Sequence, residues 1–139
     1  DLELGDLVLA LGAGTDSNVN RIRFGGYDFP ATASWPLLEH VARAARAASR
    51  PVRVGNVFSS DLFYHPDAAL HGRLRELGFL AIEMEAAGLY GLAAELGFEA
   101  LSVLTVTDHV GRPAAMTAAE RATGVDAMTR LVLESLFQA

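Results

Sequence analysis

The chain has 139 residues, of which 51% are hydrophobic and 20% are charged, and its formal net charge is −6. This length suits one domain with its own core, and the acidic balance argues against nucleic acid or an anionic membrane as a partner. There is no cysteine, which excludes disulfides, thiolate nucleophiles and cysteine metal sites. The absence of cysteine also suits a reducing cytoplasm. No apolar run reaches the roughly 18 residues of a membrane span, and no signal-peptide pattern opens the chain.

The first third of the chain predicts one strand and one long helix. A strand is expected over residues 6–12, followed by an irregular polar stretch over 14–23 and an aromatic, glycine-containing segment over 24–29. A helix is expected over about 34–49, with Ser34 as a plausible cap and apolar residues at helical spacing on one face.

The rest of the chain continues the alternation, with strands expected over 52–58, 80–82 and 100–107, and helices over 67–77, 86–96 and from a capping box at 117–120. Interleaved strands and helices with short turns predict an α/β fold with a largely parallel sheet. No repeat or linker interrupts residues 1–139, so a single domain is expected. Ligands gather beyond the carboxyl ends of such strands, and three segments are expected there, at 58–64, 83–85 and 108.

Two carboxylates, Glu83 and Glu85, flank Met84 between the strand over 80–82 and the apolar helix over 86–96. Carboxylates avoid apolar surroundings unless they are paired or bind something. At the first turn of a helix the macrodipole favours the ionised form, which can accept hydrogen bonds from a ligand's hydroxyls. Glu85 beside Met84 therefore fits a clamp for a diol with one apolar face, such as a ribose. The alternative, which the local pattern alone favours, is an acid that caps the helix.

Asp108 closes the strand expected over 100–107. An acid at the end of a buried strand is partly desolvated, which favours its protonated form near neutral pH. Arg121 lies one turn into the last helix, from where it could fold back to pair with Asp108. The alternative is an acid that begins a loop and caps a neighbouring backbone N–H.

Three further patterns bear on ligand binding. The loop over 58–64 offers aromatic faces for stacking a flat ring, although core filling is the alternative. The tripeptide over 12–14 begins like a dinucleotide-binding fingerprint, but Ser17 replaces the last glycine and 17–23 is a poor helix opening, so no Rossmann cofactor is expected. The four histidines lack zinc-binding spacing, and most of them are expected to take surface or satisfied core roles.

Several long segments together resemble the bacterial hexameric purine nucleoside phosphorylases. These segments, in matching order, are 14–24, 54–64, 83–88, 107–109 and 117–121. The Met84-Glu85 pair is shared with uridine phosphorylases and adenosylhomocysteine-type nucleosidases. The Thr107-Asp108-His109 segment and Arg121 are what point to phosphorylases acting on purines.

The resemblance implies a three-layer α/β fold with a mixed, largely parallel sheet flanked by helices and incomplete at the amino end. It implies a homohexamer when complete. The implied reaction is reversible phosphorolysis of purine (2′-deoxy)ribonucleosides to free base and (2-deoxy)ribose 1-phosphate in cytoplasmic purine salvage. Inorganic phosphate would be the co-substrate, and no metal or organic cofactor would be needed.

Substrate-binding roles follow from the same resemblance. Glu85 would bind the ribose hydroxyls, with Met84 packing on the sugar and Glu83 close by. Phe63 and Ile82 would line the base pocket.

The resemblance also implies which groups act on the leaving base. Protonated Asp108 would donate to N7 of the purine with help from Arg121, and Thr107 beside it is counted among the substrate-binding residues. The chemistry is consistent, because protonating the leaving base is general acid catalysis worth roughly 10²–10⁴ in rate. An anionic carboxylate beneath the ribose also fits the positive charge that grows on the sugar.

One departure from the family concerns phosphate. The family holds phosphate with a glycine, two arginines and a serine from an earlier part of the chain, completed by a histidine and an arginine of a neighbouring subunit. None of these positions is found here, and the chain opens at Asp1 without a methionine, so we expect a carboxyl-terminal portion that is inactive alone. Two other functions stay open: an inactive nucleoside-binding remnant, and a purine nucleosidase that uses water.

Overall fold

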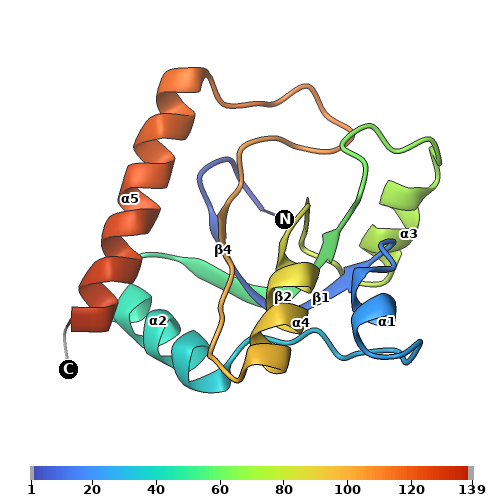
Figure 1. Ribbon diagram of the computed structural model, residues 1–139. Helices are drawn as coiled ribbons and strands as arrows, with labels where there is room; N and C mark the ends of the chain where they lie inside the picture. The colour runs from blue at the N-terminus through green and yellow to red at the C-terminus, as the bar shows by residue number, and fades with distance from the viewer. Residues whose placement is uncertain (1, 138–139) are drawn as a thin grey trace.

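The computed structural model describes residues 2–137 (Figure 1). Along the described residues the elements are β1 (Leu7–Thr15), α1 (Val19–Arg23), α2 (Trp35–Ala47), β2 (Val52–Ser59), α3 (Leu70–Glu76), β3 (Ala81–Glu83), α4 (Ala86–Leu96), β4 (Val103–Thr105) and α5 (Ala118–Phe137). The alternation of strands and helices confirms the predicted α/β class.

The strands form one mixed sheet in the order β3-β2-β1-β4. β1 pairs in parallel with β2 from Leu7 opposite Val52 to Thr15 opposite Ser59, with a register shift between Ala10 and Gly12. β2 pairs in parallel with β3, whereas β4 runs antiparallel to β1. The predicted mixed, largely parallel sheet is therefore confirmed.

β1 is the centre of the core because it is covered on both faces. Val8 and Ala10 point to the side of α4, where they pack with Ala87 and Tyr90. Successive strand residues face opposite ways, so Leu7 and Leu9 point to the other side, where α2 and α5 contribute the buried residues Val41, Ala42, Ala45 and Leu131. The result is three layers, with α4 on one face of the sheet and α2 with α5 on the other.

The stretch over 14–23, predicted to be irregular, contains the short helix α1. Asn20 of this helix is buried and donates from Nδ2 to the carbonyl oxygen of Ala87, at 2.9 Å. A Cβ at Gly91 would lie only 2.0 Å from Asn20 Oδ1, so glycine allows α1 and α4 to approach this closely. Contact with α4, rather than a local helix signal, explains why the polar stretch is helical.

One helix start differs from prediction in its position, and another differs in its capping contact. α3 begins at Leu70 rather than Asp67, because the Asp67 carboxylate accepts a hydrogen bond from the Ala69 amide at 2.9 Å and holds a turn before the helix. Ser34 is the N-cap residue of α2 as predicted by position, but its hydroxyl makes no capping bond. It donates instead to the Glu99 carboxylate at 2.8 Å.

α4 is apolar on nearly every face, yet only one side of it is covered. Its small residues and Tyr90 lie in the core, while Leu89, Leu92 and Leu96 are exposed. None of the helices within residues 2–137 has both the length and the apolar character needed to cross a membrane.

Candidate functional site

The three parallel strands end side by side and bring polar residues together. Register places Thr15 beside Ser59 and Ser59 beside Glu83. The Thr15 hydroxyl donates to the Ser59 carbonyl oxygen at 2.7 Å, which ties the ends of β1 and β2. We call the group formed by Thr15, Asp16, Ser59, Ser60, His65 and Glu83 the sheet-end cluster.

Glu83 caps the start of α4. Its carboxylate accepts hydrogen bonds from the Glu85 amide at 2.8 Å and the Ala86 amide at 2.7 Å, and also from the Ser59 hydroxyl. The Ser59 oxygen in turn accepts from the Ala87 amide at 2.9 Å. These are the amide groups that a helix leaves unpaired at its first turn, so Glu83 is used to position the helix start.

Glu85 lies at the N-cap position of α4, but its side chain makes no capping hydrogen bond. It is exposed, and within residues 2–137 its carboxylate has no hydrogen bond or ion pair. The neighbouring Met84 is 43% exposed. The two alternatives from the sequence thus fall on different residues: the capping role belongs to Glu83, and the accessible carboxylate is that of Glu85.

The aromatic residues at the end of β2 and in the loop after it also take different roles, packing for one and exposure for others. Phe58 is partly buried and packs against Phe79 with ring centroids 5.9 Å apart, so its ring is used for packing within the protein. Phe63 and Tyr64 are 77% and 89% exposed and contact each other edge to face at 5.0 Å. Ile82 of β3 lies opposite Phe58 in the register and is partly buried.

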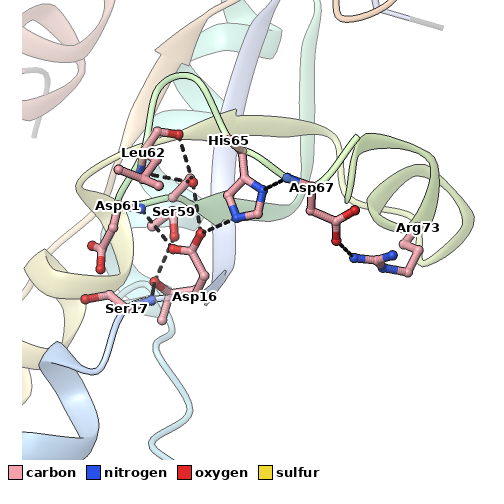
Figure 2. A network of polar contacts seen from close by, with 10 residues as sticks. Asp16, Ser17, Ser59, Asp61, Leu62, His65, Asp67 and Arg73 are labelled. Atoms are coloured by element: carbon pink, nitrogen blue, oxygen red, sulfur yellow. Dashed lines mark hydrogen bonds and ion pairs between the residues drawn. The ribbon is translucent and has the colours of Figure 1, made fainter. Parts of the chain in front are cut away.

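Asp16 and His65 belong to this cluster but were given no role from the sequence. Figure 2 shows the Asp16 carboxylate between the start of the aromatic loop and His65. Asp16 Oδ2 lies 3.0 Å from the Ser60 hydroxyl and 3.4 Å from His65 Nε2, and Oδ1 accepts from the Asp61 amide at 2.9 Å. Asp16 and Ser60 lie inside segments that resemble the family, which was the available signal; nothing in the pattern set their partners.

Asp108 and Arg121 form the pair that the sequence predicted. Arg121 Nη2 lies 3.5 Å from Asp108 Oδ1, and the Thr107 hydroxyl donates to Asp108 Oδ2 at 2.7 Å. The Asp108 side chain is 53% exposed and that of Arg121 is 50% exposed. The expected desolvation of Asp108 is therefore wrong, because β4 is a short edge strand whose residues are only partly buried.

The capping box at the start of α5 is confirmed, and Arg121 follows it in the first turn of the helix. The Thr117 amide and hydroxyl donate to the Glu120 carboxylate at 2.7 and 2.8 Å. These hydrogen bonds lower the pKa of Glu120 below its usual value. Arg121 Nε donates to the Met116 carbonyl oxygen at 3.1 Å, which directs its guanidinium toward Asp108.

The expectation that all three candidate segments follow carboxyl ends at one sheet edge is wrong for Asp108. Because β4 is antiparallel, Thr105 pairs with Leu7, at the start of β1 rather than its end. The connection to α5 then turns back toward α3: a Cβ on Gly111 would lie 3.9 Å from the Arg75 side chain (Figure 1). No hydrogen bond or ion pair between described residues joins Asp108 or Arg121 to the sheet-end cluster.

The structure bears on two possible cofactor sites, a dinucleotide site and a metal site. The glycine-containing tripeptide over 12–14 lies inside β1, so it does not form the strand-to-helix turn of a dinucleotide site. Across residues 2–137 no three His, Asp or Glu side chains are grouped so that they could hold a metal ion.

The amino-acid sequence can be compared with known families. The sequence profile of the phosphorylase superfamily matches residues 1–136, so the chain belongs to that superfamily.

Several curated relatives are similar over nearly the whole chain. Purine nucleoside phosphorylase DeoD-type 2 of Vibrio parahaemolyticus is 49% identical over 135 residues, which are 97% of this chain and 57% of the relative. Purine nucleoside phosphorylase DeoD-type of Myxococcus xanthus is 49% identical over 134 residues, 96% of this chain and 56% of the relative. Purine nucleoside phosphorylase DeoD-type 1 of Photobacterium profundum is 48% identical over 136 residues, 98% and 56% respectively. The chain thus spans little more than half the length of these relatives.

Proposed function

We propose that the chain is the nucleoside-binding and proton-donating part of a purine nucleoside phosphorylase. The reaction is the reversible phosphorolysis of purine ribonucleosides and 2′-deoxyribonucleosides to free base and the sugar 1-phosphate. The observation that supports this proposal is that Glu83 and Glu85 have different roles. Glu83 satisfies the helix start, and this leaves the Glu85 carboxylate exposed beside Met84.

The nucleoside would bind at the end of the parallel strands. Glu85 would accept hydrogen bonds from the ribose hydroxyls, and Met84 would pack against the sugar's apolar face. Phe63 and Ile82 would contact the purine; Phe63 has the exposed ring face that stacking requires. An anionic carboxylate below the sugar stabilises the positive charge that develops as the glycosidic bond breaks.

Asp108 would act as the general acid, with Thr107 beside it. Its proton passes to N7 of the purine, the bond between N9 and the anomeric carbon breaks, and a phosphate oxygen forms the new bond to that carbon. Arg121, 3.5 Å from Asp108, stabilises the carboxylate left after proton transfer. A purine lying over the half-exposed carboxyl would exclude water from it and so favour the protonated form before transfer.

Phosphate would be held by residues that the family resemblance places in an earlier part of the protein. The hexamer, the cytoplasmic location and the role in purine salvage belong to the same proposal, and neither metal nor organic cofactor takes part. We accordingly expect these 139 residues to bind nucleoside without phosphorolysis. A full-length protein, meaning one that contains these residues and has the length of the curated relatives, is expected to carry out both.

The test measures binding and turnover separately. Calorimetry with inosine on the 139-residue chain should show binding, and chromatography should show no hypoxanthine release. The full-length protein should release hypoxanthine only when phosphate is present. Release without phosphate would identify a nucleosidase, binding without any release by the full-length protein would identify an inactive binding module, and absence of binding by both proteins would refute the proposal.

A further inference from the structure

We infer that Asp16 and His65 are positioning residues that fix the aromatic loop over 61–65 for its ligand. The inference rests on the proposed function, because the ligand of the loop is taken to be the purine base. Neither residue needs to touch the substrate. Both act by holding the backbone on either side of Phe63.

One carboxylate ties down both ends of the loop. At its start, the Asp61 amide donates to Asp16 Oδ1 at 2.9 Å and the buried Ser60 hydroxyl lies 3.0 Å from Oδ2. At its end, His65 Nε2 lies 3.4 Å from the same Oδ2 (Figure 2). The Asp16 carboxylate, which follows the end of β1, therefore closes residues 61–65 into a short loop.

The orientation of the His65 ring is fixed from its other side. Nδ1 accepts a hydrogen bond from the Asp67 amide at 3.1 Å, so it cannot carry a hydrogen in this arrangement. The hydrogen therefore lies on Nε2, the nitrogen that faces Asp16. Asp67 also contacts Arg73 of α3, so the ring is held between β1 and the start of α3.

We call the contacts of Asp16 with Ser60, Asp61 and His65 the clasp. The clasp matters because few other contacts hold the side chains of the loop. Leu62, Phe63 and Tyr64 all lie largely exposed, so core packing does not fix them. The side chains of Asp16 and His65 are only 27% and 20% exposed, so their contacts are partly shielded from water. An exposed aromatic loop without such contacts would have to be ordered on binding, and ordering costs affinity.

The prediction is a selective loss of substrate affinity in the full-length protein. Asp16→Asn exchanges one acceptor oxygen for an amide donor. His65→Ala removes the Nε2 donor that faces Asp16 at the end of the loop. Each should raise the KM for inosine about tenfold while kcat changes less than about threefold, corresponding to roughly 1.4 kcal/mol of lost preorganisation. The double variant should resemble the more affected single variant, because both break one clasp.

Two variants serve as matched controls. Asp61→Ala lies in the same loop but keeps the backbone amide that Asp16 accepts from, so its KM should stay within about twofold. His65→Gln keeps a side-chain donor and an acceptor and should recover most of the loss. If Asp16→Asn does not fold, the two His65 variants provide the comparison.

Phe63→Ala separates this inference from the proposed function. If Phe63→Ala raises KM and the clasp variants do not, positioning is wrong and the proposed function stands. If the clasp variants lower kcat at constant KM, their role is general stability and the inference is also wrong. If the unmodified full-length protein neither binds inosine nor releases hypoxanthine, the proposed function fails and the inference fails with it.

Discussion

The sheet-end cluster and the Asp108–Arg121 pair are held in very different ways. In the cluster, Ser59 and Ser60 are buried, and the carboxylates of Asp16 and Glu83 each accept several hydrogen bonds from neighbouring strands or helix amides. The Asp108–Arg121 pair is half exposed and lies after a three-residue edge strand. The first region is organised by the fold itself, whereas the second makes few contacts with the rest of the fold.

The difference follows from strand direction. Parallel strands that end together place hydroxyls, carboxylates and amides in fixed register, so their hydrogen bonds form as a consequence of sheet pairing. The chain after antiparallel β4 leaves the sheet elsewhere and is held by an isolated bridge between Asp108 and Ala115 and by the capping box of α5. If this contrast is correct, changes in the pair should affect chemistry, and changes in the cluster should affect binding or stability.

The largest effect is expected from Asp108→Asn in the full-length protein. An amide cannot supply the proton that the leaving purine takes up, so kcat should fall by roughly 10²–10⁴. The Kd for inosine should change by less than about threefold, because the side chain keeps its size and polarity. Steady-state kinetics and calorimetry measure the two quantities, and equal losses in both would mean that Asp108 is not the acid.

The next largest effect separates the two neighbouring glutamates. Glu85→Gln should weaken inosine binding about 10–100-fold, because hydrogen bonds to a charged group contribute about 1.5–3 kcal/mol. Its free energy of unfolding should change by less than about 0.5 kcal/mol, since the side chain is exposed and makes no capping bond.

Glu83→Gln is the matched comparison and should show the opposite pattern. Its carboxylate accepts from Ser59 and from two helix amides, and an amide group leaves at least one of these donors poorly paired. Urea denaturation should show a loss of about 1–3 kcal/mol. If Glu85→Gln proved the more destabilising of the two, the assignment of cap and ligand group would have to be exchanged.

An effect of similar size is expected where α1 packs on α4, the helix that Glu83 caps. Gly91→Ala would place a Cβ 2.0 Å from the buried Asn20 Oδ1 and should destabilise the chain by about 1–3 kcal/mol. Gly88→Ala, on the same helix with open space around it, should be neutral or stabilise by up to about 1 kcal/mol. Thermal unfolding of the two variants side by side measures the contrast, and similar behaviour would show that the close approach is unimportant.

The smallest effect concerns Tyr90, which fixes α4 to β1. Its hydroxyl donates to the Ala10 carbonyl oxygen at 2.6 Å and accepts from the Ser102 amide at 3.0 Å, so Tyr90→Phe should cost about 1–2 kcal/mol. Burial raises the pKa of Tyr90 above its usual value of 10.0.

This pKa shift gives the prediction a pH dependence. Because the folded-state pKa is raised, the associated stability is complete below pH 10 and is lost as pH rises through the folded-state pKa. The Phe variant should lack this alkaline loss. Unfolding curves between pH 8 and pH 11 compare the two proteins, and parallel curves over that range would contradict the assignment.

Some of the site could be predicted from the sequence because its signals are local. The Glu83-Met84-Glu85 segment between a strand and an apolar helix, and the capping box that begins α5, are both readable from neighbouring residues. The pairing of Arg121 with Asp108 followed from their distance along one short loop and helix turn. Which glutamate caps α4 could not be predicted, because the answer depends on Ser59 from another strand.

The sequence by itself determined the α/β class, the order of all its elements except α1, and the types of chemical group available, because periodicity, turn residues and caps act over a few positions. Only the tertiary structure decided that β4 is antiparallel, that residues 19–23 form a helix and that one Asp16 carboxylate holds both ends of the aromatic loop. These features depend on contacts between residues some 45 to 95 positions apart in the chain, such as Asp16 with Asp61 and Leu9 with Val103. Such pairings are chosen by the packing of the whole sheet, and no local pattern specifies them.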